Sequence, residues 1–210
     1  KRLKPSDASR KVIDTGFGEY IFVEETKYKV LTGVARLTKD GQSVSGDTFS
    51  MINLPSGELL MALSDGMGSG TSAFDDSKNV IELLEQMSEA GFSQTSAIRL
   101  INSLYMSDQE FENYATLDIS LINLYKGECS FLKNGAVGTY VLNQGKMYCI
   151  EGQSLPMGVV SDAEPYIGKM SLYPGDYVIM MTDGVADMFS QERYNLEKFI
   201  KQIEIVNPGD

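Results

Sequence analysis

The stretch Leu59-Leu60-Met61-Ala62-Leu63 leads directly into Ser64-Asp65-Gly66-Met67-Gly68-Ser69-Gly70. Its apolar part predicts a buried strand, and a helical pattern begins near Thr71. A carboxylate at the end of a buried strand is costly without a partner, and the glycines after it let the backbone approach a ligand closely. A hard cation meets both conditions, because it binds carboxylate and carbonyl oxygens. The alternative is an ordinary strand-to-helix turn with a solvated Asp65, and this stretch alone does not decide between the two.

Composition narrows the class of protein. The chain has 210 residues, of which 42% are hydrophobic, and its net charge is −11. This length predicts one globular domain with its own core. We expect no nucleic-acid partner, because no basic patch is available to neutralise phosphates. The acidic balance is compatible with carboxylates that hold a divalent metal, although a solvated acidic surface is the commoner cause. No apolar run approaches the ~20 residues of a membrane span, so we expect no membrane contact by this chain.

The sequence contains no histidine. That absence excludes Ser-His-Asp and Cys-His catalysis and removes the usual zinc ligands. The two cysteines, Cys129 and Cys149, lie far apart in strand-like runs and are expected to be small buried residues of the core. Oxygen ligands remain, and they favour Mg²⁺ or Mn²⁺ over zinc.

The first third of the chain predicts a linker followed by strands. Residues 1–15 are polar and basic, and we interpret them as a linker or the end of an upstream regulatory segment, with the folded domain at 16–210. Alternating apolar residues predict strand from Tyr20 to about Val34. Residues 48–54 and 58–63, joined by Pro55-Ser56-Gly57, predict a hairpin. That hairpin would place Asp47 and Asp65 at the same edge of one sheet.

Two consecutive helices come next, and they favour an antiparallel sheet with a helical layer on its face. The first is expected to end at Gly91, and Ser93 is expected to cap the second. Their predicted apolar stripes are Val80, Leu83, Leu84 and Met87, then Ala97, Leu100, Ile101 and Leu104. Beyond Thr116 the pattern predicts a meander of hairpins, a strand over 166–172, a strongly buried strand over 177–181 and a helix over 191–206.

A second hydroxyl-Asp-Gly sequence, Thr182-Asp183-Gly184, follows the buried run 177–181 just as Ser64-Asp65-Gly66 follows the earlier one. Two such carboxylates brought together repel each other unless metal or protons neutralise them. A pair of Mg²⁺ or Mn²⁺ ions can share an activated water and hold a phosphoryl group for in-line attack. This chemistry requires no protein nucleophile, which agrees with the absence of histidine.

Five motifs occur in order along the chain: Ser45-Gly46-Asp47, Ser64-Asp65-Gly66-Met67-Gly68-Ser69-Gly70, Thr116-Leu117-Asp118, Leu155-Pro156-Met157-Gly158 and Met181-Thr182-Asp183-Gly184. With them the chain resembles the metal-dependent Ser/Thr protein phosphatases, the PPM family, over residues 28–200. Within that family it is most similar to the sporulation stage II E branch. The resemblance implies an α+β fold, an α-β-β-α sandwich of two antiparallel sheets flanked by helices, with a two-metal site at one end.

The same resemblance implies a ligand set. Asp65 would bridge two ions, Asp47 and the Gly66 carbonyl would complete one of them, and Asp183 would bind the other. Asp118 is either an exposed strand residue or an outer partner of the metal ligands. The family pattern has a further Asp for the ion at Asp183, and the sequence given ends at Asp210 without it. One of the two Mn²⁺ or Mg²⁺ sites is therefore expected to be weak or empty in this chain.

The function implied by the resemblance is hydrolysis of phosphoserine or phosphothreonine on a regulatory protein by a water that the two ions activate. The substrate would be a phosphorylated anti-anti-sigma factor, whose dephosphorylation activates a sporulation sigma factor. The chain would then be a cytoplasmic domain of a membrane-anchored bacterial protein, and a homodimer through the domain or an upstream segment is a further expectation. Two alternatives stay open: a catalytically silent regulatory or oligomerisation module of the same fold, and a small-molecule phosphoesterase.

Overall fold

Two antiparallel sheets form the body of the molecule. The structure is a computed structural model, and it describes residues 10–14, 19–23, 25–36, 38, 45–68, 70–107, 114–161, 164–190, 198, 199 and 202. The five-stranded sheet has the order β3-β4-β5-β6-β9, and the three-stranded sheet has the order β10-β7-β8. The strands of the larger sheet are β3 (Asp47–Asn53), β4 (Glu58–Asp65), β5 (Leu117–Asn123), β6 (Glu128–Asn134) and β9 (Tyr166–Ser171). Those of the smaller sheet are β7 (Thr139–Asn143), β8 (Lys146–Ile150) and β10 (Tyr177–Ile179).

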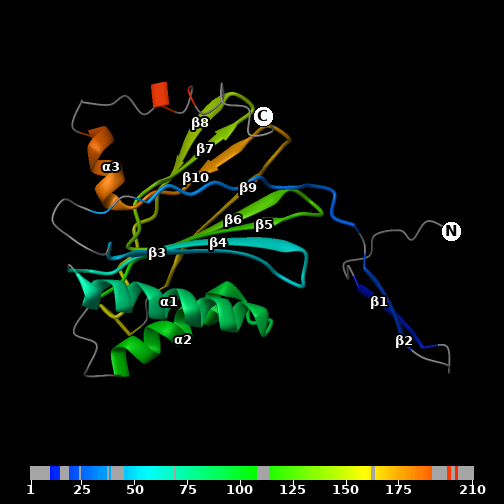
Figure 1. Cartoon of the computed structure of the whole chain (residues 1–210), viewed down its shortest axis with the longest axis horizontal. Helices are drawn as coiled ribbons and strands as arrows, with labels where there is room; N and C mark the ends of the chain where they lie inside the picture. Colours follow the sequence, from blue (N-terminus) through cyan, green and yellow to red (C-terminus); the bar gives the residue numbers. More distant parts are fainter. Residues whose placement is uncertain are drawn as a thin grey trace.

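Helices α1 (Thr71–Glu89) and α2 (Gln94–Ser107) cover one face of the larger sheet, and the smaller sheet lies on its other side (Figure 1). Helix α3 (Asp183–Ser190) follows β10. A separate hairpin of β1 (Arg10–Asp14) and β2 (Glu19–Val23) lies apart from the sandwich, and β1 falls inside the segment predicted as a linker. The layers confirm the predicted α+β sandwich. Among the described residues no helix is long and apolar enough to cross a bilayer.

The alternation of β4 directs its side chains into two different cores. Leu60 and Ala62 pack against the helices, whereas Leu59 and Met61 pack toward the smaller sheet. Continuing the period of two, Asp65 falls on the face that points to the smaller sheet. Strand β4 therefore places the Asp65 carboxylate between the two sheets, at the edge of the sandwich.

The hairpin of β3 and β4 confirms the prediction made for it. Its register pairs Asp47 directly with Asp65. The chain turns at residues 54–57, where Gly57 adopts a φ of 81° and its N–H donates to the carbonyl of Leu54 at 2.9 Å. A side chain at this position would also meet the ring of Tyr125, so the turn requires glycine.

The helix boundaries agree with the predicted caps. Gly91 has a φ of 87°, and the N–H groups of Gly91 and Phe92 donate to the carbonyls of Ser88 and Met87, which closes α1 with a Schellman motif. The Ser93 hydroxyl accepts from the Ser96 N–H at 3.2 Å and caps α2.

The predicted apolar face of α2 is partly wrong. Leu100 and Leu104 are 44% and 46% exposed, while Ile98 and Tyr105 are buried beside Ala97 and Ile101. The helix is turned toward α1 and toward the loop after β8. The buried Asn102 explains this orientation, because its amide donates to the carbonyls of Val160 and Ser161 and accepts from the Gly158 N–H.

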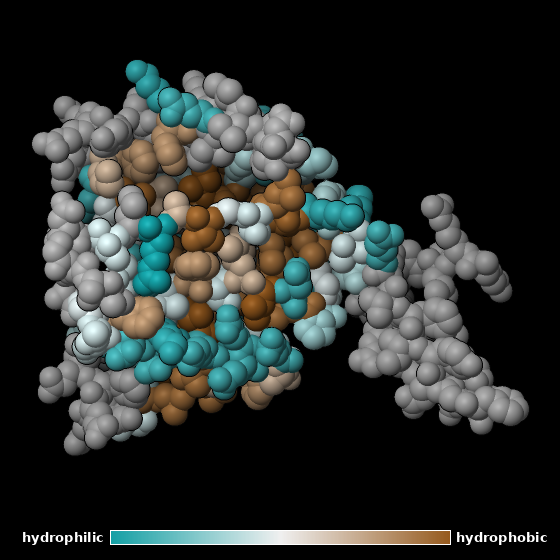
Figure 2. Space-filling view, viewed as in Figure 1, coloured by the Kyte–Doolittle hydropathy of each residue, from teal (hydrophilic) through white to brown (hydrophobic). Residues whose placement is uncertain are grey.

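Three further expectations differ from the structure. Residues 25–36 form no strand, and the side chains of Val30, Leu31 and Val34 in this segment are exposed. Figure 2 shows apolar side chains gathered on one face of the molecule. The hairpins β5–β6 and β7–β8 belong to different sheets, so they are not one meander. Strand β10 ends at Ile179 and is only half-buried. Of the predicted helix over 191–206, only Lys198, Phe199 and Gln202 are described, and they are helical.

Candidate metal centre

Three carboxylates from both sheets meet at one end of the sandwich. Asp47 and Asp65 face each other across β3 and β4, and Asp183 begins α3 directly after the segment that leaves β10. Burial, then the charges of Asp47 and Asp183, together with hydrogen bonds to both carboxyls, raise the pKa of Asp65 from 3.8 to about 8. The structure thus brings together the three acidic residues that the sequence predicts as metal ligands.

Hydroxyl groups hold Asp47 in place. Its Oδ2 accepts from the Ser45 hydroxyl at 3.0 Å and, at a longer 3.4 Å, from the Thr182 hydroxyl. Thr182 belongs to the segment that leaves the smaller sheet, so this contact connects the two halves of the site. The hydroxyl residue that precedes Asp183 in the sequence therefore has a role: it reaches across to the other carboxylate.

The hydroxyl before Asp65 serves a different purpose. Ser64 is fully buried, and its Oγ donates to the carbonyl of Thr116 at 2.8 Å. The Asp65 N–H donates to the Thr116 hydroxyl at 3.1 Å, and the Thr116 N–H donates back to the Asp65 carbonyl at 2.9 Å. These contacts lock the end of β4 to the start of β5, so the backbone of Asp65 is fixed on both sides.

Two glycines give the site its close packing. A Cβ on Gly66 would lie 1.9 Å from the carbonyl oxygen of Ala73 in α1, so only glycine fits there. A Cβ on Gly46 would lie 3.4 Å from the Gly66 carbonyl oxygen and 3.9 Å from Asp65 Oδ1. One point beside Gly46 is therefore near both of these oxygens, which are two of the predicted ligand atoms.

The donor set fits a hard cation. Within the described ranges, no three Asp, Glu, His or Cys side chains are spaced to hold a single ion together. A two-ion arrangement does not need such a triplet, because Asp47 and Asp65 would serve one ion while Asp65 and Asp183 serve the other. Carboxylate and carbonyl oxygens, completed by water, are the ligands that Mg²⁺ and Mn²⁺ prefer.

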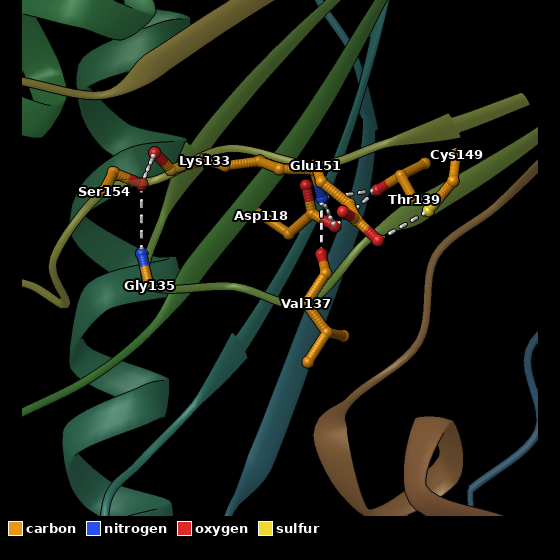
Figure 3. A network of polar contacts seen from close by, with 8 residues as sticks. All are labelled: Asp118, Lys133, Gly135, Val137, Thr139, Cys149, Glu151 and Ser154. Atoms are coloured by element: carbon orange, nitrogen blue, oxygen red, sulfur yellow. Dashed lines mark hydrogen bonds and ion pairs between the residues drawn. The ribbon is translucent and has the colours of Figure 1, made fainter. Parts of the chain in front are cut away.

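Asp118 lies deeper between the sheets, in the network shown in Figure 3. It is 2% exposed, and its Oδ2 accepts from Lys133 Nζ at 2.8 Å and from the Thr139 hydroxyl at 2.6 Å. The alternative of an exposed strand residue is therefore wrong. Burial raises the pKa of Asp118, while Lys133 and Thr139 oppose that shift. Asp118 Oδ1 has no hydrogen-bond partner among the described residues, and its role as an outer partner of the metal ligands stays a prediction.

Lys133 and Arg36 are the two basic residues that sequence reasoning missed. The Lys133 ammonium is fully buried and also donates to the carbonyl of Val137 at 2.7 Å and to the Thr139 hydroxyl at 2.8 Å. Its signal was present in the sequence, because Lys133 alternates with Cys129 and Phe131 and so shares their buried face of β6. Arg36 donates to two main-chain carbonyls next to the centre, and no pattern in the sequence indicates such contacts.

The cysteines separate into two environments. Cys129 is buried as expected, and burial raises the pKa of its thiol. Cys149 is exposed, which corrects the expectation of a core residue; its strand lies at the edge of the smaller sheet. Partial burial and a hydrogen bond to Glu151 raise the pKa of the Cys149 thiol. Neither thiol is therefore prepared to act as a thiolate nucleophile.

Comparison with known proteins places the chain in a family. The family model of stage II sporulation protein E (SpoIIE) matches residues 55–208. Stage II sporulation protein E of Bacillus subtilis (strain 168) is 35% identical over 170 residues, which cover 81% of this chain and 21% of that protein. The protein of the same name from Priestia megaterium is 38% identical over 158 residues, covering 75% of this chain and 27% of that protein. The chain thus spans about a quarter of the length of these relatives.

Solved structures agree with this assignment. The PP2C phosphatase domain of SpoIIE from Bacillus subtilis, solved with a fragment of its regulatory domain, has a TM-score of 0.76 and 33% identity, covering 88% of this chain and 53% of that chain. RsbX in complex with magnesium has a TM-score of 0.59 and 26% identity, covering 70% of this chain and 71% of that chain. These neighbours support a divalent metal requirement. The chain belongs to the stage II sporulation protein E family of PP2C-type protein serine/threonine phosphatases.

Proposed function

We propose that this chain is a catalytic domain that removes phosphate from serine or threonine of a regulatory protein with two Mn²⁺ or Mg²⁺ ions. The observation that carries the proposal is the convergence of Asp47, Asp65 and Asp183 from two sheets. Burial and mutual repulsion make this cluster unfavourable unless cations or protons neutralise it. A strongly perturbed carboxylate with charged partners is typical of a functional site.

Each residue has a proposed role. Asp65 would bridge the two ions, Asp47 and the Gly66 carbonyl would bind one, and Asp183 would bind the other. When bound, the ions activate a water and neutralise the charge of the phosphoryl group. The chain's own contribution is orientation: Ser45 and Thr182 fix the Asp47 carboxylate, and Thr116 fixes the backbone of Asp65.

A protein substrate agrees with the open surroundings of the carboxylates. Met67 and Tyr114, joined by a hydrogen bond from the Met67 N–H to the Tyr114 carbonyl, are 49% and 42% exposed beside Gly66, and Asp183 is exposed as well. A phosphoserine on a protein surface would reach such a site directly. The Bacillus subtilis relative named phosphoserine phosphatase RsbX is 40% identical over 65 residues, which supports this substrate class. Within it we propose a phosphorylated anti-anti-sigma factor, whose dephosphorylation activates a sigma factor.

The test is a phosphatase assay on the metal-free chain with a phosphorylated anti-anti-sigma protein, with and without Mn²⁺ or Mg²⁺. We expect metal-dependent release of phosphate, and a loss of more than about a hundredfold in the Asp65→Ala variant. Asp75→Asn is the matched control, because Asp75 is an exposed carboxylate at the start of α1 outside the cluster. Near-normal turnover in Asp65→Ala would refute the proposed site.

The two alternatives give different results in the same assay. A folded chain that releases no phosphate at any metal concentration would be a silent regulatory or oligomerisation module. A chain that hydrolyses p-nitrophenyl phosphate but ignores the phosphoprotein would be a small-molecule phosphoesterase. Dimer formation and membrane anchoring of the whole protein stay predictions from the family resemblance.

A further inference from the structure

Arg36 lies at the end of the segment 25–36, which is attached to the sandwich at its start. The Tyr28 N–H donates to the carbonyl of Leu124 at 2.9 Å. From there the segment, blue in Figure 1, runs between the two sheets in this view, toward the end that carries α3 and the start of β3. Arg36 Nη2 donates to the carbonyls of Ser45 at 3.0 Å and Asp47 at 2.7 Å. One side chain thus joins the two carbonyls that flank Gly46.

The guanidinium also stacks on the helix behind the centre. Its central carbon lies 5.6 Å from the centroid of the Phe74 ring, in the first turn of α1. Phe74 follows Ala73, whose carbonyl abuts Gly66. Arg36 therefore touches the backbone of one predicted metal ligand directly, and it contacts the helical turn against which the other ligand packs.

These contacts fix Asp47 without occupying its ligand atoms. Arg36 binds the main-chain carbonyl of Asp47, while hydroxyl groups bind the carboxylate Oδ2. Fixing the carbonyl at the first residue of β3 limits rotation of the backbone that carries the carboxylate. Because Arg36 is an exposed residue, solvent screens its repulsion of a nearby cation, and the geometric effect should dominate. Both bonds leave from Nη2 while the planar guanidinium lies over the Phe74 ring. The ammonium of a lysine has donors but no plane that stacks on the ring in this way.

We propose that Arg36 is a positioning residue of the metal centre: by joining the Ser45 and Asp47 carbonyls and stacking on Phe74, it holds Asp47 in the orientation that binds the cation. This inference rests on the proposed function, in which Asp47 is a metal ligand. It adds a residue from outside the five sequence motifs to the centre, and it makes the end of the segment 25–36 part of the site.

The test is a titration of Mn²⁺ into the metal-free chain, with free Mn²⁺ measured by electron paramagnetic resonance. We expect Arg36→Ala and Arg36→Lys to weaken Mn²⁺ binding by about tenfold to a hundredfold, as outer partners of metal ligands usually do. Lys27→Ala is the matched control, since Lys27 is an exposed cation of the same segment that stacks on Tyr28 instead. With saturating Mn²⁺, kcat should recover to within about twofold of the parent value, with KM for the phosphoprotein unchanged.

Each other outcome overturns the inference. Unchanged Mn²⁺ binding with a raised KM would make Arg36 a contact for the phosphoryl group. Unchanged Mn²⁺ binding with only a lowered melting temperature would make it scaffold. Near-parent Mn²⁺ binding in Arg36→Lys, with weaker binding in Arg36→Ala, would assign the effect to charge. In these cases the parent chain still binds Mn²⁺, and the proposed function stands. Failure of the parent chain to bind Mn²⁺ would refute both the role of Arg36 and the proposed function.

Discussion

At the scale of single residues, the Asp65 carboxyl is a group whose protonation depends strongly on the fold, and it is also a proposed metal ligand. Its pKa of about 8 lies far above the ordinary value of 3.8, because burial and the charges of Asp47 and Asp183 disfavour its ionised form. Between these two pH values the folded, metal-free chain holds a proton at Asp65 that the unfolded chain has lost. The free energy of unfolding contributed by this group is therefore fully present below pH 4 and is lost as the pH rises toward 8.

The first prediction follows from the direction of this pH dependence. In EDTA, the melting temperature of the chain should fall as the pH rises from about 5 to about 8. The Asp65→Asn variant should show a flatter dependence, because it keeps a neutral, hydrogen-bonding side chain at every pH. Thermal unfolding followed by circular dichroism across this range would measure both. A profile that is the same in the two proteins would show that Asp65 does not carry the proton.

The second prediction concerns the buried pair of Lys133 and Asp118. Replacing Lys133 with Met leaves the Asp118 carboxyl buried without its cation, which should lower the free energy of unfolding by about 3–5 kcal/mol. Adding Asp118→Leu to the same chain should recover much of that loss, because no buried charge then remains unpaired.

The exposed ion pair of Arg99 and Glu164 is the matched control for this experiment. Its side chains are 61% and 63% exposed, so Arg99→Ala should cost less than about 1 kcal/mol. Urea unfolding would measure all three variants. If Lys133→Met cost no more than Arg99→Ala, the network in Figure 3 would be peripheral to stability.

At the scale of elements, the two Asp-Gly pairs look alike in the sequence but place different demands on the chain. Gly66 abuts the backbone of α1, with its missing Cβ 1.9 Å from the Ala73 carbonyl oxygen. Gly184 lies in the first turn of α3, and no atom of the described part of the chain lies within 4 Å of the position that its Cβ would take. The first glycine fixes the distance between β4 and α1, while the second only continues a helix.

The third prediction compares these two glycines. Gly66→Ala must push α1 away from the end of β4, and should lower both stability and Mn²⁺ affinity. Gly184→Ala should keep both, since alanine favours helix over glycine by up to about 1 kcal/mol. Melting temperature and Mn²⁺ titration of the two variants provide the comparison. Equal losses at both positions would mean that the close packing of Gly66 against α1 has no special role.

The sequence predicts those elements whose signals are local. The β3–β4 hairpin, the Gly91 cap and the Ser93 cap depend on a few neighbouring residues, and the structure has all three. The buried face of α2 depends on contacts between Asn102 and a loop more than fifty residues later in the sequence. The apolar stripe of the helix therefore predicts the wrong buried face. Likewise, motifs predict that Asp47, Asp65 and Asp183 come together. They do not predict Arg36, whose role depends on main-chain carbonyls that have no signature in the sequence.

At the scale of the whole molecule, the candidate centre lies where the two sheets meet. Asp47 and Asp65 belong to the five-stranded sheet, while Thr182 and Asp183 follow the short strand β10 of the three-stranded sheet. Strand β10 is half-buried and pairs with β7 over only three residues. A cation shared between these carboxylates would therefore attach the weaker sheet to the stronger one, so metal binding should stabilise the β10–α3 segment more than the rest.

The fourth prediction follows from this unequal attachment. Saturation at a hundred times the dissociation constant should stabilise the chain by about 2.7 kcal/mol and raise its melting temperature. Hydrogen exchange should locate that gain, with amides of residues 177–186 slowing most on addition of Mn²⁺. In Asp183→Asn the slowing should disappear from this segment while a smaller effect persists at the ends of β3 and β4, because Asp47 and Asp65 still bind. Equal protection of both sheets in Asp183→Asn would show that the cation does not connect them, and a melting temperature indifferent to millimolar Mn²⁺ and Mg²⁺ would count against the site while leaving the fold intact.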